Sequence, residues 1–363
     1  MSRRTRTVSV PKATAAGLVV LVAALAWTTL APATPGTEPR NGSLTVFTGG
    51  TTSLDSSNVG RIGTVGGGKH TRLWRCPGNV WCGEPVSFAW APDGRRVAFT
   101  LDELGGTSTY VGLRVVNVVS GRDMRVPGGA PKTASITDDP VAWNAYYQKT
   151  QHRVGCFPAA EFAWAPDGTR LAYICRPDQQ PYRQELDVLK LRGSGHTTIP
   201  TNSEPFWPSW SASGTRIAYS TQLTPSSESG IYTIALDGSH KRLAASGGAA
   251  PAWSPNGRTI AYQTTCGIRL VTPSGMDVTP RANANACGAI GHSGPPVWSP
   301  DGTKLAAETS DGIYVMNKNG GGLHRVSKQA TTTWYGGLPG RPSWRPIRQR
   351  AVAPKKEMAC PAG

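Results

Sequence analysis

One motif recurs along most of the chain and limits the folds that are open to it. A short apolar run ends in tryptophan, a turn such as Pro-Asp-Gly follows, and an alternating run such as Ile217-Ala218-Tyr219 comes next. A repeat of this regularity predicts stacked copies of one supersecondary unit. The motif tryptophans are Trp90, Trp164, Trp210, Trp253, Trp298 and Trp344, with intervals of 74, 46, 43, 45 and 46 residues.

Each copy predicts four short strands in one antiparallel sheet. In the third copy these are the strand that ends at Trp210 and the runs at 217–219, 231–234 and 242–243, with glycine-containing turns between them. Four strands in a repeat of this length are typical of a β-propeller blade. The long first interval contains no second motif and therefore indicates an insertion near residues 128–157.

The two ends of the repeat region complement each other. Residues 44–74 contain apolar runs for three strands but no leading tryptophan strand, and the last copy, at 342–347, contains that strand alone. Pairing the two ends would remove two exposed sheet edges. We therefore predict an all-β, six-bladed β-propeller over residues 44–346 whose N- and C-terminal strands share one blade, preceded by a signal peptide.

The N-terminal segment predicts export. Residues 1–33 carry Arg3, Arg4, Arg6 and Lys12 without an acid, followed by a run of apolar and small residues, which is the layout of a signal peptide. Small residues favour cleavage after Ala33, with a short linker at 34–43. The alternative is an uncleaved N-terminal membrane anchor, because the run is just long enough to span a bilayer. In both cases we expect the rest of the chain to be extracytoplasmic, secreted or tethered to the outer side of the cytoplasmic membrane.

Composition and charge narrow the classes of partner. Only 38% of the residues are hydrophobic, which excludes a polytopic membrane protein. The net charge of +16 falls to +12 without the four cations of the signal, and a basic flexible tail at 347–363 holds a further part. Export argues against nucleic acid as a partner. We expect instead electrostatic contact with an anionic wall polymer or a membrane surface.

The 7 cysteines of an exported chain indicate disulfide bonds. Six of them fall in loops on the side of the ring where the blades are connected, and the blade scheme makes specific pairs neighbours. Six cysteines allow many connectivities, and peptide mapping without reduction tests the choice. Cys360 in the tail is left over, free or available for an intermolecular bond. The predicted pairs are Cys76–Cys82, Cys156–Cys175 and Cys266–Cys287.

Aromatic residues without a period are the candidate binding residues. They lie in the loops that enter the blades, and rigid exposed aromatics are typical hot spots for protein or sugar partners. A short helix beginning after Asp139 would place the aromatics of the insertion on one side. The alternative is that each ring packs beneath its own loop. The candidates are Trp81, Trp143, Tyr146, Tyr147, Trp207, Trp334 and Tyr335.

No residue pattern selects a catalytic or metal site. Four histidines recur before the fourth strand of their units, and four Asp or Asn residues recur in the motif turn, where such side chains stabilise turns. Neither a zinc-type spacing nor a defined pair of carboxylates is present. We therefore expect no cofactor, no metal and no catalytic residue, and keep as the alternative a carbohydrate-active hydrolase or lyase in the propeller funnel. The recurring residues are His70, His196, His240 and His324, and Asp93, Asp167, Asn256 and Asp301.

The units of the type WSPDG followed by IAY resemble the repeats of TolB-type, WD40-like six-bladed propellers, and the resemblance covers residues 44–346. Full-length TolB proteins also carry an N-terminal domain, whereas we expect the propeller alone here. Such rings serve many roles, so the resemblance implies a fold rather than an activity. We expect a monomeric binding or scaffolding module at the bacterial cell envelope, whose partner is an envelope protein or a cell-wall glycan.

Overall fold

The computed structural model describes twelve segments of the chain. They are residues 40–48, 59–65, 70–75, 85–102, 111–125, 157–176, 184–192, 196–222, 229–280, 295–309, 311–328 and 342–347. All of them belong to one of the two units into which the chain divides, Gly36–Gly363. The predicted signal peptide lies outside the described residues. No helix among those residues is long and apolar enough to cross a membrane.

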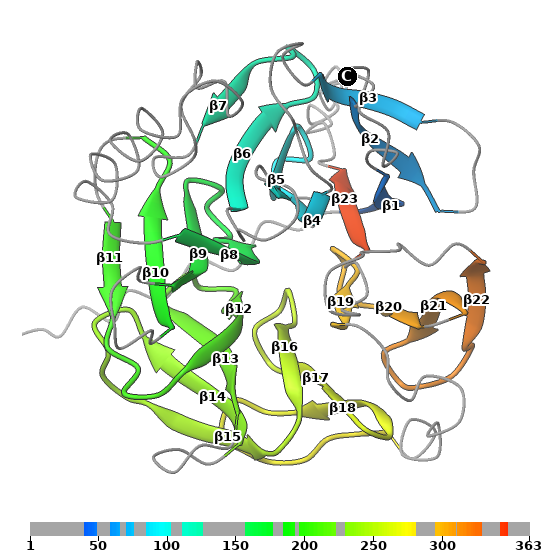
Figure 1. Cartoon of the computed structure of the whole chain (residues 1–363). Helices are drawn as coiled ribbons and strands as arrows, with labels where there is room; N and C mark the ends of the chain where they lie inside the picture. Colours follow the sequence, from blue (N-terminus) through cyan, green and yellow to red (C-terminus); the bar gives the residue numbers. More distant parts are fainter. Residues whose placement is uncertain are drawn as a thin grey trace, which may run out of the picture. The chain divides into compact units, whose positions relative to one another are not determined.

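The described residues form strands and turns (Figure 1). The first antiparallel sheet contains β4 (Pro85–Trp90), β5 (Arg96–Asp102), β6 (Val111–Asn117) and β7 (Asp123–Arg125). The second contains β8 (Phe157–Trp164), β9 (Arg170–Arg176), β10 (Glu185–Lys190) and β11 (His196–Ile199). The third sheet contains β12 (Pro205–Trp210), β13 (Arg216–Thr221), β14 (Gly230–Ala235) and β15 (Arg242–Ser246). The fourth contains β16 (Ala249–Trp253), β17 (Ile260–Thr264) and β18 (Gly267–Val271). The fifth sheet contains β19 (Val297–Trp298), β20 (Lys304–Thr309), β21 (Gly312–Asn317) and β22 (His324–Ser327). The sixth contains β23 (Ser343–Ile347) together with β1 (Arg40–Thr48), β2 (Val59–Thr64) and β3 (His70–Arg75).

The motif strand of each unit is the innermost strand of its sheet. Strand β4 contacts β8, β8 contacts β12, β12 contacts β16, β16 contacts β19, β19 contacts β23, and β23 contacts β4. These six strands lie around the centre of the arrangement in Figure 1, and residues from all six line one cavity. Sheets that meet in this cyclic way around their inner strands are the arrangement of a β-propeller, so the predicted all-β propeller is confirmed.

The first and last strands of the described chain share one sheet, as the sequence predicts. Leu44 pairs with Trp344 and Thr45 with Ser343, and the Thr45 hydroxyl donates to the Ser343 carbonyl oxygen at 2.9 Å. Strand β1 begins at Arg40, before the predicted start at residue 44. A bulge between Asn41 and Leu44 explains the difference, because it lets the pairing with β23 continue beyond Leu44.

The motif turns lie at one end of the inner strands, which we call the turn side of the ring. The opposite end, where the inner strands begin, is the loop side. In the first turn Gly94 has φ 64, and a Cβ there would meet the Pro346 carbonyl oxygen. The Asp93 carboxylate accepts the N–H groups of Arg95 and Arg96 at 2.8 and 3.0 Å. Asp167, Asn256 and Asp301 accept turn N–H groups in the same way, which confirms the predicted turn role of this position.

The hydrophobic core lies between neighbouring sheets. Ile174 and Leu186 of one sheet, for example, pack against Ile217 and Ile234 of the next, and all four side chains are fully buried. Burial of an aliphatic side chain of this size contributes about 1.5–3 kcal/mol. Because each sheet is buried on both sides by its neighbours, the sheets stabilise one another rather than folding as separate units.

The sheet of β16, β17 and β18 has three strands, although the repeat predicts four. The chain turns back after β18 and forms a single bridge between Val271 and Asp277. Its backbone hydrogen bonds run from Val278 N–H to the Leu270 carbonyl oxygen and from Thr272 N–H to the Met276 carbonyl oxygen. Pro280 follows at once and has no N–H group to extend the ladder. The fourth strand is therefore reduced to a short return.

Candidate binding site: the central cavity and its loop-side rim

The inner strands surround a cavity of about 410 Å³. Each motif tryptophan borders it, together with the residue two positions later in the turn, which is proline in most copies. The polar side chains on the wall are serines, Ser209, Ser211, Ser254 and Ser343, and the residues that line the cavity carry no charge. The cavity wall as described can therefore hold apolar and hydrogen-bonding groups.

Tryptophan indoles join each inner strand to the one before it. The Nε1–H of Trp164 donates to the Ala89 carbonyl oxygen at 3.1 Å, that of Trp210 to Ala163 at 3.1 Å, and that of Trp298 to Ala252 at 2.9 Å. In each case the acceptor directly precedes the motif residue of the preceding copy. A buried indole N–H needs a partner, and here the partner fixes the distance between two sheets.

Three motif tryptophans depart from this pattern, and the buried Nε1–H of one of them, Trp344, has no hydrogen-bond partner among the described residues. Trp90 Nε1–H donates to the Thr45 hydroxyl at 2.6 Å, so that the first unit is tied to the sheet shared by the chain ends. Trp253 Nε1–H donates within its own turn, to the Gly257 carbonyl oxygen at 3.1 Å. Its backbone N–H reaches the preceding strand instead, by donating to the Ser209 hydroxyl at 2.8 Å.

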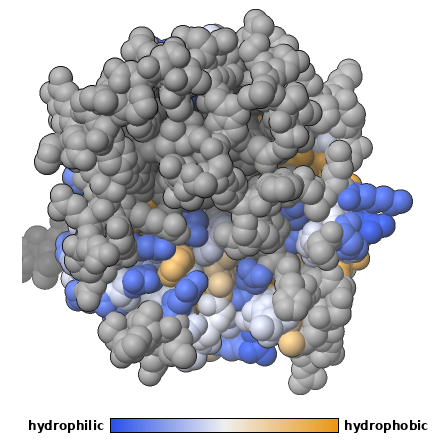
Figure 2. All heavy atoms as spheres, in the orientation of Figure 1, coloured by the Kyte–Doolittle hydropathy of each residue, from blue (hydrophilic) through white to orange (hydrophobic). Residues whose placement is uncertain are grey.

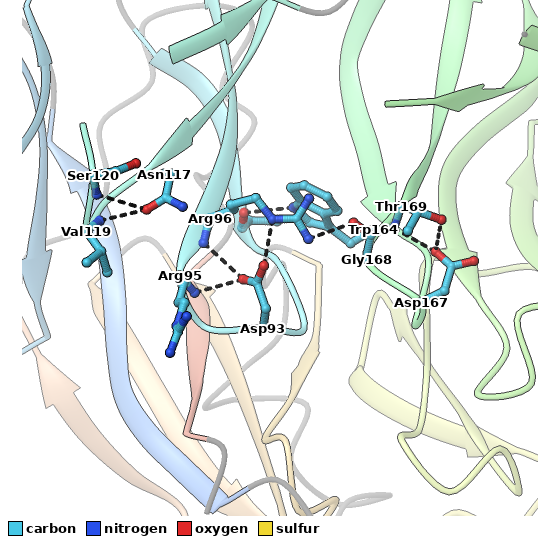
Figure 3. A network of polar contacts seen from close by, with 11 residues as sticks. Asp93, Arg95, Arg96, Asn117, Val119, Ser120, Trp164, Asp167, Gly168 and Thr169 are labelled. Carbon is cyan, nitrogen blue, oxygen red and sulfur yellow. Dashed lines mark hydrogen bonds and ion pairs between the residues drawn. The ribbon is translucent and has the colours of Figure 1, made fainter. Parts of the chain in front are cut away.

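An arginine after the motif turn connects neighbouring sheets on the turn side. The Arg96 guanidinium donates to Asp93 Oδ2 at 2.6 Å and to the Gly168 carbonyl oxygen at 2.8 Å, and it lies over the Trp164 ring at 5.1 Å from the ring centre (Figure 3). This combination fixes the guanidinium by charge, by hydrogen bond and by cation–π contact. We call it the arginine bridge.

The carbonyl and indole contacts of the arginine bridge occur at three junctions between sheets, and among the described residues the ion pair to an aspartate occurs at two of them. Arg170 donates to the Gly214 carbonyl oxygen and lies 4.7 Å from the Trp210 ring centre. Arg345 of β23 donates to the Gly94 carbonyl oxygen and lies 4.8 Å from that of Trp90. In the third unit Arg216 turns to its own sheet and donates to Thr233 and to the His240 carbonyl oxygen. The next two units have Thr259 and Lys304 at this position.

The motif carboxylates are held in their ionised form. Burial alone would raise the pKa of Asp93, but hydrogen bonds from Arg95 and Arg96 and the charge of Arg96 outweigh burial and lower this pKa. Burial opposes the shift at Asp167 as well, and hydrogen bonds from Thr169 and Arg170 lower its pKa. These aspartates therefore act as fixed negative partners of the arginine bridge.

The loop-side rim is formed by the residue three positions before each motif tryptophan. Among the described residues these rim positions are Ser87, Glu161, Trp207, Ala250 and Pro295. The acid and the aromatic ring stand in neighbouring sheets, and Trp207 N–H donates to Glu161 Oε2 at 2.6 Å. A bulge between Phe206 and Ser209 leaves this N–H outside the ladder and available to the carboxylate.

Trp207 has a left-handed backbone, with φ 53, and a partly exposed side chain. Ala250, at the same rim position of the next sheet, has φ 51. Both residues precede a buried proline, Pro208 or Pro251. Two of the five described rim positions thus share this conformation, and Trp207 differs from Ala250 by the indole that it carries at the bulge. Bulges commonly re-aim a side chain in this way.

Trp207 is the one predicted binding residue that the structure describes. Trp81, Trp143, Tyr146, Tyr147, Trp334 and Tyr335 lie outside the described residues, as does the predicted helix of the insertion, so these stay predictions. Large exposed apolar side chains among the described residues are Val119, Met276 and Ile347, each in a different sheet. On the face shown in Figure 2 the coloured surface is mainly hydrophilic, with apolar spots that stand apart.

Of the predicted disulfide cysteines the structure describes Cys175 and Cys266, and it contradicts one of the three predicted pairs. Cys266 is an exposed free thiol, so the predicted Cys266–Cys287 bond is wrong for this structure. The reason is local: Cys266 sits in the tight turn between β17 and β18, where its N–H donates to the Thr264 hydroxyl at 3.2 Å, rather than in a long loop. Cys175 is buried in β9. Cys76, Cys82, Cys156 and Cys287 lie outside the described residues, so the other two pairs stay predictions.

Potential metal ligands do not gather among the described residues: no group of three or more His, Cys, Asp or Glu side chains is placed to hold an ion. Asp187 in β10 is a buried acid whose pKa is raised by burial. It accepts a hydrogen bond from the Tyr173 hydroxyl at 3.3 Å, and His196 Nε2 lies 4.0 Å from the same oxygen. Asp187 does not line the central cavity.

The fold resembles known propellers, although the sequence matches no family model and no characterised protein. TolB from Acinetobacter baumannii matches with a TM-score of 0.55 and 13% identity, over 84% of this chain and 67% of that chain. A putative TolB from Agrobacterium tumefaciens has a TM-score of 0.48 and 18% identity, over 71% and 84% of the two chains. A chain of a nidogen/laminin complex has a TM-score of 0.48 and 9% identity, over 76% of this chain and 89% of that chain. At such identities likeness establishes the fold alone.

Proposed function

From its TolB-like β-propeller fold, we propose that this chain is an exported six-bladed propeller that acts as a protein- or glycan-binding module at the bacterial cell envelope. The signal-like segment at 1–33 supports export, and the cysteine content supports an oxidising compartment. Six inner strands in cyclic contact support six blades. The partner we propose is an envelope protein or a cell-wall glycan.

A ring held in one shape is suited to recognition. The arginine bridges and the indole hydrogen bonds fix the distance between neighbouring sheets on the turn side and around the cavity. Binding loses less free energy to ordering when the binding surface is already fixed. Loops attached to such a ring are therefore presented at constant separations, and several of them can contact one partner together.

The observation that carries the proposal is the rim pair of Trp207 and Glu161. A left-handed backbone costs a bulky residue on the order of 1–3 kcal/mol, yet here a charge-assisted hydrogen bond of 2.6 Å holds Trp207 in it. Alanine stands at the same position of the next sheet, so packing of the repeat does not require an indole. A rigid, partly exposed tryptophan is the residue type most often found at the centre of binding sites.

Trp207→Ala tests the proposal. We expect the labelled protein to bind one or more members of a glycan and peptide array, and the variant to bind at least about 30-fold more weakly, which corresponds to about 2 kcal/mol at a hot spot. The fold should persist, because Ala250 adopts the same backbone. Trp143→Ala and Trp334→Ala, measured on the same array, report whether the entry loops contribute.

Met276→Ala is the matched control, because it removes an exposed apolar side chain from a turn that is remote from the rim. Its binding should equal that of the unaltered protein. If Trp207→Ala retains full binding while its thermal unfolding is unchanged, the rim is not the recognition surface and the proposal fails.

A further inference from the structure

A second cavity lies on the turn side, between the sheet of β4–β7 and the sheet of β8–β11. Its volume is about 550 Å³, within the range of small-molecule sites. Five cations line it, Arg96, Arg122, Arg170, Lys190 and Arg192, with Asp93 as the acid. We call it the basic cleft. It shares no residue with the loop-side rim, so it does not depend on the function proposed above.

Two of the five cations are already neutralised. Arg96 pairs with Asp93 at 2.6 Å, and Arg170 pairs with Asp167 at 2.8 Å. Both oxygens of Asp93 are engaged, because one accepts two backbone N–H groups and the other accepts Arg96. Arg96 and Arg170 are therefore each offset by an aspartate of their own motif turn.

The other three cations have no counter-charge among the residues that the structure describes. Arg122, Lys190 and Arg192 are exposed, and none of them makes an ion pair with another described residue. Lys190 is also the direct cross-strand partner of Arg170. Like charges directly opposite each other destabilise a sheet, and Asp167 offsets only the charge of Arg170, so Lys190 keeps a charge that a bound anion would offset.

Hydrogen bonds fix the main chain at the positions of these three cations. Asn117 N–H donates to the Arg122 carbonyl oxygen at 2.9 Å, and the Asn117 side chain accepts the N–H groups of Val119 and Ser120 (Figure 3). On the opposite wall, Leu191 N–H, between Lys190 and Arg192, donates to the Thr169 carbonyl oxygen at 2.9 Å. Each wall of the cleft is thus tied to its own sheet or motif turn.

We propose that the basic cleft binds the phosphodiester groups of an anionic polyol-phosphate polymer. Guanidinium groups match the oxygens of phosphate with paired hydrogen bonds, and lysine adds a compact charge. The volume leaves room for the alcohol units on either side of a phosphate. The residues that line the cleft include no aromatic ring on which a base could stack, which favours a polyol chain over a nucleic acid.

Titration of the full chain with a synthetic glycerol-phosphate oligomer tests the site. The variant Arg122→Gln/Lys190→Gln/Arg192→Gln should bind at least about ten-fold more weakly, and binding of the unaltered protein should weaken as salt is raised, since salt screens exposed charges. Inorganic phosphate and vesicles of phosphatidylglycerol are titrated in parallel. The strongest binder among the three identifies the source of the phosphate group.

The control variant Arg242→Gln/Arg258→Gln/Lys318→Gln removes the same charge from exposed cations that do not line the cleft. We expect less than about two-fold weakening from it, because net charge alone acts weakly across distances beyond the screening length. Equal weakening in both variants, or none in the cleft variant, overturns the proposal. Trp207→Ala should bind the oligomer normally, which separates this site from the rim. Thermal unfolding of both triple variants should match that of the unaltered protein to show that they fold.

Discussion

Single residues on the turn side decide how tightly neighbouring sheets are joined. Arg96 is the clearest case, because one guanidinium contacts a carboxylate, a carbonyl oxygen and an indole face belonging to two different sheets. Its side chain is only 23% exposed, so these contacts are partly shielded from solvent. Arg95, one residue earlier, makes hydrogen bonds through its backbone N–H and carbonyl groups and has an exposed side chain.

Arg96→Ala should therefore lower the free energy of unfolding by about 1–2 kcal/mol, from the lost cation–π contact and hydrogen bonds. Urea unfolding measures this difference. Arg95→Ala is the matched control and should change the stability by less than about 0.5 kcal/mol, as exposed substitutions generally do. Equal effects of the two variants would show that the bridge adds nothing.

The roles of some of these residues can be predicted from the sequence, and the roles of others cannot. Asp93 and its equivalents are readable because the motif turn repeats them. The partner of Arg96 cannot be predicted from the sequence, since Gly168 belongs to the neighbouring unit and the two residues meet only when the two sheets pack together. The same is true of Trp207 and Glu161. A proline two positions before the motif tryptophan, as in Pro208 and Pro251, is the available cue for the left-handed rim residue.

At the level of strands, the repeat predicts most elements but not their exceptions. The runs at 217–219 and 231–234 correspond to β13 and β14 because alternating apolar residues face two neighbouring sheets. The three-stranded sheet of β16–β18 departs from the repeat where Pro280 limits the ladder. Cys266 departs from the predicted loop pairing because β17 and β18 are joined by a tight turn.

Strand β10 carries an acid in its buried centre, and this sets a pH dependence. Burial raises the pKa of Asp187, so the folded protein binds the proton more readily than the unfolded chain. The folded state should gain stability from this group as pH falls through the raised pKa towards the ordinary value, and lose it as pH rises. Asp187→Asn should therefore increase the urea midpoint at pH 8 and change it little at pH 4, while still accepting from Tyr173.

Asp167→Asn should change the stability in the opposite direction from Asp187→Asn at pH 8. Its pKa is lowered by hydrogen bonds and by Arg170 despite burial, so its ionised form stabilises the folded state above the ordinary pKa, and this contribution is lost as pH falls through the lowered pKa. The variant should lower the midpoint at pH 8. A lower midpoint for Asp187→Asn at pH 8 would contradict the account of β10.

At the level of the whole molecule, the ring depends on the pairing of its first and last strands. Thr45 and Ser343 connect β1 to β23, and Trp90 donates to both residues, through its indole and its backbone N–H. Arg345 adds the arginine bridge to the Gly94 turn. The shared sheet can be predicted from the sequence because the N-terminal unit lacks the motif strand that the C-terminal end of the repeat region supplies.

Hydrogen exchange in residues 40–48 tests closure of the ring, the central claim, most directly. A chain ending at Arg348 retains β23, whereas a chain ending at Arg341 lacks it. We predict that amides of β1 are as protected in the chain ending at Arg348 as in the full chain, and that this protection is lost in the chain ending at Arg341, because backbone hydrogen bonds to β23 are gone. Equal protection of residues 40–48 in all three chains would contradict closure by the shared sheet.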